Sequence, residues 1–365
     1  MQEKKSNKKE VKDKTQLTFF SLLQAGLWSE PEKQVAVDGA VNWDEIYQLA
    51  SEQSVLGLVL AGIDCLPIDQ RPPKLLLLQW IGEIQMLEQQ NKEMNLFIGE
   101  MVKKMRKEGI YTLLVKGQGI AQSYDRPLWR SSGDVDLLLS KDNYPKAKRF
   151  LLPLSSSQKN DERYSKHKGM SIDPWYVEIH GTLRTGLSGR VDKEVDAVQD
   201  DVFFHGNVRP WDNNGTTVFL PSADNDVFFI FTHFIKHFYK EGMNLRQLCD
   251  WCRLLWTFRD SLKHGLLELR IRKAGLMSEW KAFAALVVEY LGMPVKAMPM
   301  YDKGNLWSKK AKNILKFIMK GGQPNALRDI ITIMKIFPYN TFKFMPSIFL
   351  NVNGFKIYER LFPES

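Results

Sequence analysis

Cysteine is scarce in this sequence, which has only Cys65, Cys249 and Cys252 among its 365 residues. Three cysteines in so long a chain do not make the disulfide framework on which small secreted domains depend. Long apolar runs are also missing, because no stretch reaches the roughly 18 residues that a membrane-spanning helix needs. The opening residues, MQEKKSNKKE, lack the apolar core of a signal peptide. These absences predict a cytoplasmic protein with no membrane span.

The composition is that of an ordinary globular protein, with 44% hydrophobic and 25% charged residues. The length allows two or three domains. A formal net charge of +9 suits an anionic ligand such as a nucleotide. The lysines are scattered rather than gathered in one stripe, so a nucleic-acid partner stays open but is not indicated.

The chain divides into four parts by composition and by the spacing of its apolar residues. Six lysines and three acidic residues within 1–14 predict a disordered basic tail over residues 1–16. Apolar residues then recur at helical spacing, which predicts an N-terminal helical region over 17–109 and a C-terminal helical region over 221–365. Between them, short apolar runs bounded by glycine and proline predict an α+β core over 110–220. Strands are expected there over 111–115, 133–140, 169–172, 175–180 and 216–220.

Two carboxylates stand two residues apart in an otherwise apolar segment, at Asp134 and Asp136. Side chains i and i+2 of a β-strand point to the same face, so the two aspartates share one face, while Val135 and Leu137 share the other. Carboxylates this close repel each other and lose hydration unless a cation lies between them. Hard cations such as Mg²⁺ take carboxylate oxygens together with substrate phosphates. The pair predicts a site for metal-assisted phosphoryl chemistry; the competing interpretation is a turn aspartate beside an exposed strand residue.

A third carboxylate is available at Glu178, in the apolar run 175–180. His180 follows two residues later and so faces the same side of the strand. If this strand pairs beside the strand of Asp134 and Asp136, three carboxylates converge on one or two cations. The alternative for Glu178 is a solvated charge on an edge strand.

A glycine-rich turn, Lys116-Gly117-Gln118-Gly119, lies between a predicted strand and a predicted short helix. Glycines let backbone N–H groups approach an anion, so the turn is a candidate triphosphate cradle. It is not a Walker motif, because the spacing and the Lys-Ser/Thr ending are absent. Arg130 is a further candidate for holding a phosphate. Pairing with a site carboxylate and a plain surface position are the alternatives for this arginine.

Taken together, these motifs resemble a known family. They look like the bacterial uncharacterised nucleotidyltransferase family of the DNA polymerase β-like nucleotidyltransferase superfamily. The shared features are the Lys-Gly turn at Lys116, the Arg-x-x-Gly-Asp-hydrophobic-Asp strand that starts at Arg130, and the hydrophobic-Glu-hydrophobic-His strand that ends at His180. The resemblance extends to paired histidines, here His233 and His237. It implies a small mixed β-sheet core flanked by helical regions, with the site on its open face.

The resemblance also implies an activity. A nucleotidyltransferase of this kind transfers a nucleoside monophosphate from an NTP, such as ATP, to an acceptor and releases pyrophosphate. It would use Mg²⁺ or Mn²⁺, held by Asp134, Asp136 and Glu178 as the catalytic carboxylates. Residues 116–119 and Arg130 would bind the nucleotide. The acceptor is not specified: a small molecule, a protein and an RNA all stay open.

Two positions depart from the family pattern. Gln118 follows Gly117 where the superfamily usually has serine, and Gly181 stands where the family has a bulky aromatic residue. Neither departure removes a metal ligand. They motivate the alternative function, a non-catalytic nucleotide-binding or scaffold protein on a degenerate nucleotidyltransferase core.

His233 and His237 stand four residues apart on a predicted helix and would share one face. The residues between them, 234–236, supply no glutamate base, so the pair does not match a metalloprotease zinc motif. Packing histidines with one hydrogen-bond partner each are one interpretation. The resemblance favours another, in which these two histidines and His180 line the acceptor pocket or support the metal ligands.

Overall fold

The computed structural model describes residues 2–28, 35, 37, 40–158, 167–324 and 326–346, with side chains from Lys14 onward. The chain forms two compact units. The first comprises Met1–Thr182, Val208–Pro221 and Tyr290–Gly292, and the second comprises Leu183–Asn207, Ser222–Glu289 and Met293–Ser365. The N-terminal helices therefore belong to the same unit as the sheet. The four-part division expected from the sequence stays a prediction.

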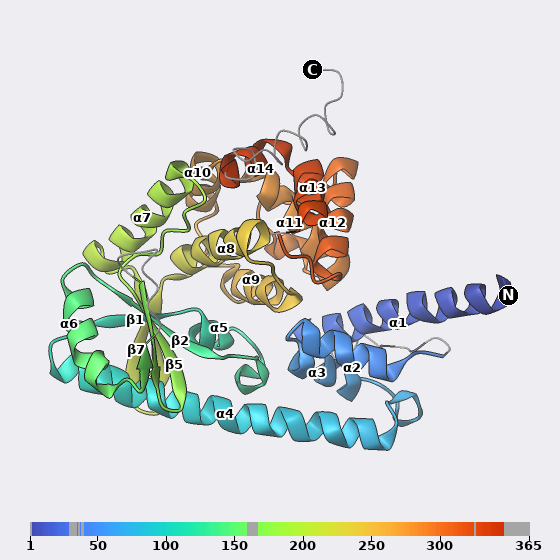
Figure 1. The fold of residues 1–365 in the computed structure, drawn as a ribbon, viewed down its shortest axis with the longest axis horizontal. Helices are drawn as coiled ribbons and strands as arrows, with labels where there is room; N and C mark the ends of the chain where they lie inside the picture. The colour runs from blue at the N-terminus through green and yellow to red at the C-terminus, as the bar shows by residue number, and fades with distance from the viewer. Residues whose placement is uncertain are drawn as a thin grey trace. The chain divides into compact units, whose positions relative to one another are not determined.

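The first unit is organised around a mixed seven-stranded sheet, counted over the described residues (Figure 1). The strand order is β3-β4-β5-β2-β1-β7-β6. Strands β2 and β5 pair in parallel, as do β1 and β7, whereas the other neighbours pair antiparallel. The strands are β1 (Thr112–Val115), β2 (Asp134–Leu139), β3 (Ser157–Gln158), β4 (His167–Ile172), β5 (Trp175–His180), β6 (Val208–Asn213) and β7 (Thr216–Pro221).

The helices of the first unit precede the sheet in the chain or connect its strands. Their order confirms the predicted α+β class with helical flanks. They are α1 (Gln2–Trp28), α2 (Trp43–Glu52), α3 (Leu56–Asp64), α4 (Lys74–Lys107), α5 (Gly117–Ala121) and α6 (Asn143–Leu151), with the 3-10 turns η1 (Ile68–Gln70), η2 (Pro127–Trp129) and η3 (Leu152–Leu154).

Helix α1 contains most of the residues that were predicted to form a disordered tail. Lysine, glutamate and glutamine, which are frequent over residues 2–16, have high intrinsic helix propensity. A composition rich in these charged and polar residues does not by itself exclude a helical backbone. The prediction of a disordered backbone over residues 2–16 is therefore corrected to a helix.

Helices α4 and α6 cover one face of the sheet (Figure 1). Ile98 and Val102 of α4 and Leu151 of α6 meet the strand residues Leu137 and Val177 in one buried cluster. Burial of each such side chain contributes about 1.5–3 kcal/mol. The pleat of β2 sends Val135, Leu137 and Leu139 into this cluster. Its alternate residues, including Asp134 and Asp136, therefore face the opposite side of the sheet.

Strand β6 is an element that the sequence did not reveal. It contains Arg209, Pro210 and Asp212, which break the alternation of apolar residues that marks a strand. Because β6 lies at the end of the strand order, one of its sides has no neighbouring strand among the described residues. Proline and charged residues are tolerated at such an edge, where a backbone donor is not needed for the ladder.

The second unit is helical and has an aromatic core. The Trp280 ring lies 4.8 Å from the rings of both Phe231 and Trp251, and Phe234 packs 5.1 Å from Phe283. Its elements are α7 (Gly189–Phe204), α8 (Ala223–Lys240), α9 (Leu245–Phe258), α10 (His264–Ala274), most of α11 (Met277–Leu291), η4 (Val295–Ala297), α12 (Asn305–Ile318), α13 (Leu327–Ile336) and α14 (Pro338–Phe344). No helix within the described ranges combines the length and the apolar character needed to cross a membrane.

The three thiols should differ in reactivity. Cys65 is exposed, whereas Cys249 and Cys252 are fully buried on α9, and burial raises the pKa of both of these thiols. A thiol-specific colorimetric reagent should titrate Cys65 alone in the native protein and all three cysteines in denaturant. The variant Cys65→Ser should give no rapid reaction while folded. Rapid reaction of two thiols in the folded Cys65→Ser variant would show that Cys249 and Cys252 on α9 are accessible, and would contradict their buried positions.

Candidate active site

Three carboxylates converge on the sheet face opposite α4 and α6. Asp134 and Asp136 lie on β2 and Glu178 on β5, and the parallel register of these strands places Asp136 directly beside Glu178. One carboxylate oxygen from each residue lies within 4.8 Å of the others. The pairing of β2 with β5, which was the condition for this convergence, is therefore present. The arrangement can hold a divalent cation through oxygen ligands.

Asp136 is the most deeply buried of the three carboxylates, with 1% of its surface exposed. Lys116 donates a hydrogen bond from Nζ to Asp136 Oδ1 over 2.7 Å, and His180 Nε2 lies 2.7 Å from the same oxygen. Burial alone raises the pKa of Asp136, but the Lys116 cation and the His180 hydrogen bond outweigh it and hold this pKa well below its usual range. Asp136 is therefore ionised and already has two partners.

Lys116 is the cation of this pair. Burial lowers the pKa of its ammonium group, but the attraction of Asp136, and to a smaller extent of Asp134 and Glu178, leaves the pKa raised above its usual value. The sequence interpretation assigned Lys116 to a phosphate. The structure shows its Nζ paired with a carboxylate of the site, so any contact with a phosphate requires this lysine to share or exchange its partner.

Glu178 has two histidine neighbours. Its Oε2 lies 3.0 Å from His167 Nε2 and 3.6 Å from His180 Nε2. Burial raises the pKa of Glu178, but the hydrogen bond from His167 and nearby positive charge outweigh it and lower the pKa. Burial lowers the pKa of His180 against the opposing hydrogen bond of Asp136. Glu178 is thus held as a carboxylate at the edge of the acidic group.

His167 is a site residue that the sequence reasoning missed. The predicted strand began at Gly169, whereas β4 begins at His167, directly opposite His180 in the antiparallel pair. The rings of His167 and His180 stack with their centres 4.3 Å apart. The sequence could have indicated this residue. If the predicted strand is extended backwards by two residues, His167 lies opposite His180 in the hairpin and therefore on the same face as His180 and Glu178.

The glycine turn has an unusual backbone. Lys116 has φ 59° and ψ −152°, a region that residues other than glycine rarely occupy, and Gly117 has φ 41°. A Cβ at Gly117 would lie 3.3 Å from the Asp134 carbonyl oxygen and 3.4 Å from Ser132 Oγ. The turn therefore runs tightly against the start of β2. Strained backbone of this kind is concentrated at functional sites.

Two polar side chains beside this turn differ from the sequence interpretation. Gln118 is buried and donates from Nε2 to Asn91 Oδ1 of α4 over 2.6 Å, so its side chain secures the turn to the helix. Ser132 was not singled out. Its Oγ is buried and has no hydrogen-bond partner among the described residues. Because it lies next to Gly117, Ser132 offers a hydroxyl where the family pattern expects one at position 118.

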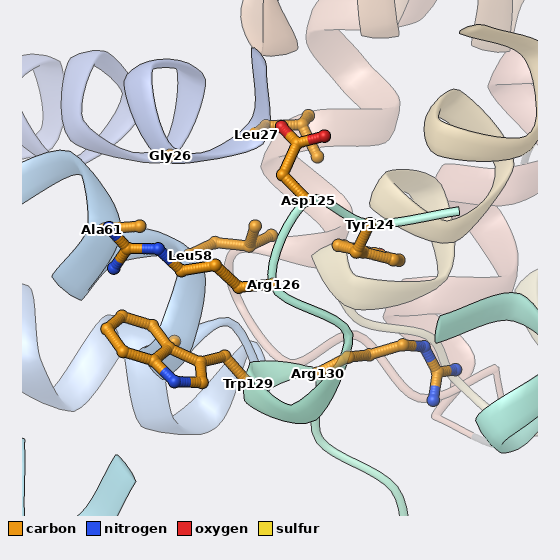
Figure 2. Close-up of a pocket in the computed structure, with 10 residues that line it drawn as sticks. Gly26, Leu27, Leu58, Ala61, Tyr124, Asp125, Arg126, Trp129 and Arg130 are labelled. Atoms are coloured by element: carbon orange, nitrogen blue, oxygen red, sulfur yellow. The ribbon is translucent and has the colours of Figure 1, made fainter. Parts of the chain in front are cut away.

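Arg130 lines a small pocket in the first unit (Figure 2). Its guanidinium group is buried and donates from Nη1 to the Ser131 carbonyl oxygen over 3.1 Å. Figure 2 shows Arg126 next to Trp129, with the Arg130 side chain extending away from them; the Arg126 guanidinium lies 4.3 Å from the Trp129 ring centre. The other lining residues are Gly26, Leu27, Gly57, Leu58, Ala61, Tyr124 and Asp125. The predicted phosphate role of Arg130 stays a prediction.

His233 and His237 belong to α8 of the second unit. Their Nε2 atoms lie 3.1 Å apart, and His237 Nδ1 lies 2.9 Å from Glu241 Oε2. The hydrogen bond from His237 is the largest of the effects that lower the pKa of Glu241, to about 2. The expected shared face is confirmed. Their role toward an acceptor stays a prediction.

The comparison with known families gives one clear match. A family described as "Uncharacterised nucleotidyltransferase" matches residues 39–292, and the chain belongs to this family. Among solved structures, the chain is similar to an antigenic nucleotidyltransferase-like protein from Paracoccidioides brasiliensis. The identity is 12%, the match covers 55% of this chain and 93% of that chain, and the TM-score is 0.33. No curated protein matches the chain.

The Lys116–Asp136 pair should be important for stability. Lys116→Met leaves a buried carboxylate without its main cation, so we expect the free energy of unfolding to fall by about 3 kcal/mol. Urea denaturation in metal-free buffer measures this change. The double variant Lys116→Met/Asp136→Asn, which removes both charges, should recover part of the loss.

Lys141→Met is a matched control for this measurement, because Lys141 is an exposed lysine just after the opposite end of β2. We expect its effect to stay within about 0.5 kcal/mol. Equal losses in Lys116→Met and Lys141→Met would show that the pair does not stabilise the fold.

Proposed function

We propose that this protein is a metal-dependent nucleotidyltransferase that transfers a nucleoside monophosphate from an NTP to an acceptor and releases pyrophosphate. The observation that supports it is the convergence of Asp134, Asp136 and Glu178 within 4.8 Å on one sheet face, in a chain of the nucleotidyltransferase family. The wider relationship to the DNA polymerase β-like superfamily is part of this proposal.

The residues present fit a hard divalent cation. Asp134, Asp136 and Glu178 offer three carboxylate oxygens, the donor type that Mg²⁺ and Mn²⁺ prefer. Such an ion, when bound, lowers the pKa of an attacking hydroxyl and neutralises charge on the departing pyrophosphate. Glu178 is the third of these carboxylates, and we assign it the further task of accepting a proton from the acceptor.

The chain's own residues organise this site. His180 and Lys116 fix the position of Asp136 through hydrogen bonds of 2.7 Å each. The ammonium of Lys116 is a fixed positive charge beside the carboxylates, where it favours the binding of an anionic triphosphate. The tight turn at Gly117 brings backbone N–H groups close to the start of β2, and these are the donors that we assign to the phosphates.

Ser132 is assigned to the triphosphate as well. Its buried Oγ has no partner among the described residues and lies against the turn, so it can donate to a phosphate oxygen. Hydrogen bonds to charged groups contribute about 1.5–3 kcal/mol. Ser132→Ala should therefore raise KM for the NTP, or the Kd of an NTP in a binding assay, about tenfold or more.

Ser140→Ala is the control for this substitution, since Ser140 follows the opposite end of β2, where its Oγ accepts a hydrogen bond from the Asn143 backbone N–H. Its KM should match that of the parent. A KM in Ser132→Ala that equals the KM in Ser140→Ala would remove Ser132 from the phosphate site.

A non-catalytic binding protein is the second candidate function. The observation in its favour is that Asp136 Oδ1 already has Lys116 and His180 as partners, which balances its charge without a metal ion. The substitutions at Gln118 and Gly181 relative to the family pattern agree with it. The acceptor, whether small molecule, protein or RNA, belongs to the catalytic proposal alone.

The variant Asp134→Asn/Asp136→Asn separates the two candidates. The parent should release pyrophosphate from at least one NTP in a Mg²⁺-dependent or Mn²⁺-dependent manner, and NTP with the metal should raise its unfolding temperature. The double variant should lose both effects, because it removes two of the three carboxylate ligands. Coupled pyrophosphate detection and thermal-shift assays measure them.

Asp142→Asn, a substitution of an exposed aspartate beyond β2, is the control and should behave like the parent. Parent-like pyrophosphate release by the double variant would reject the assigned site. NTP binding without release by the parent, across metals and acceptor classes, would favour the non-catalytic candidate.

A further inference from the structure

A second group of ligand-type side chains adjoins the carboxylates. His167 of β4 and Glu178 and His180 of β5 offer one atom each, and these three atoms lie within 4.8 Å of one another. Both histidines use Nε2: His167 Nε2 lies 3.0 Å and His180 Nε2 lies 3.6 Å from Glu178 Oε2. Two imidazole nitrogens and one carboxylate oxygen therefore surround a common point.

These separations match those found around a bound cation. A metal ion about 2.0–2.2 Å from each nitrogen or oxygen ligand holds neighbouring ligand atoms about 3 to 3.5 Å apart. The distances of 3.0 and 3.6 Å to Glu178 Oε2 fall in or next to this range. The three ligand atoms all lie within 4.8 Å of one another, so side-chain rotation would bring them onto one ion.

The hairpin holds the two imidazoles in place. His167 and His180 are directly opposite in the antiparallel register, and their rings stack with 23° between the ring planes. His167 Nε2 lies within hydrogen-bond distance of Glu178, and His180 Nε2 lies between Glu178 and Asp136, 2.7 Å from Asp136 Oδ1. A pair of rings aligned with both Nε2 atoms near the same carboxylate is the arrangement that a metal ion uses.

We propose that His167, Glu178 and His180 form a binding site for a borderline transition-metal cation of the Zn²⁺ class, distinct in ligand type from the all-carboxylate site. Imidazole nitrogen selects such cations over Mg²⁺, which prefers oxygen ligands. A histidine binds a metal through a deprotonated nitrogen, so the cation would displace the proton between His167 Nε2 and Glu178 and the one between His180 Nε2 and Asp136. Asp136 would then keep Lys116 as its partner.

Glu178 belongs to both groups. A carboxylate has two oxygens and can bridge two cations, as in sites that hold two metal ions about 3.5–4 Å apart. The inference therefore goes beyond the proposed function: the carboxylates would hold one Mg²⁺-type cation, and the histidines with Glu178 would hold one Zn²⁺-type cation. The side chains of His167 and Glu178 are 29% and 21% exposed, so an ion from solvent can reach both of them.

The test uses the full chain freed of metal and titrated with Co²⁺ alone, whose visible absorption reports nitrogen ligands. Competition with a coloured chelator measures the Kd for Zn²⁺. The parent should bind about one tight equivalent. His167→Gln should weaken binding by at least about tenfold. Loss of a residue that only hydrogen-bonds to a metal ligand already lowers metal affinity about 10–100-fold, and loss of a ligand should cost no less. Thermal unfolding verifies that each variant is folded.

Two variants are the controls. His264→Gln removes an exposed histidine of the second unit and should bind Co²⁺ like the parent. Asp134→Asn removes a ligand of the all-carboxylate site alone and should keep the Co²⁺ spectrum while it loses Mg²⁺-dependent NTP binding. The inference and the proposed function therefore fail separately.

Folded His167→Gln with the affinity and spectrum of the parent would overturn the inference. So would loss of the Co²⁺ signal in His237→Gln but not in His167→Gln, because the tight site would then lie on α8. Absence of tight Co²⁺ and Zn²⁺ binding by the parent would overturn it as well, and would leave the proposed function untouched.

Discussion

The buried charge of Asp136 is the constraint on which the site depends. An ionised carboxylate with 1% exposure is stable only when other groups replace its lost hydration. Lys116 and His180 do so from opposite neighbouring strands, since one follows β1 and the other ends β5. The unusual backbone of Lys116 is part of the same arrangement, because it holds the lysine at the end of β1 where its ammonium reaches Asp136.

The sheet order explains why these groups meet. Asp136 and His180 are 44 residues apart in the chain, yet the parallel pairing of β2 and β5 places their strands side by side. The antiparallel hairpin of β4 and β5 then adds His167. Helices α4 and α6 cover the other face, so apolar residues stabilise one side of β2 and β5 while charged residues gather on the other. The face covered by α4 and α6 therefore contributes to the stability of the fold, and the opposite face has the charged residues of the candidate site.

Most of this core could be predicted from the sequence. The helical flanks and the existence of β1, β2, β5 and β7 follow from apolar periodicity and glycine or proline boundaries. Strand β6 could not, because an edge strand tolerates the charges and proline that hide it. The helical backbone of residues 2–16 was missed since polarity reports burial and not conformation. The hydrogen bond from Gln118 to Asn91 of α4 and the position of Ser132 Oγ beside Gly117 could not be predicted, because both depend on packing between segments that are distant in the chain.

The sequence by itself determined that Asp134 and Asp136 share a face, because the two-residue period of a strand is a local property of the backbone. It also determined that Glu178 and His180 share a face, and it carried the motifs of the family. Only the tertiary structure decided what surrounds them. That Lys116 pairs with Asp136 and that His167 stacks on His180 depend on strand order and register, which arise from contacts between residues far apart in the chain.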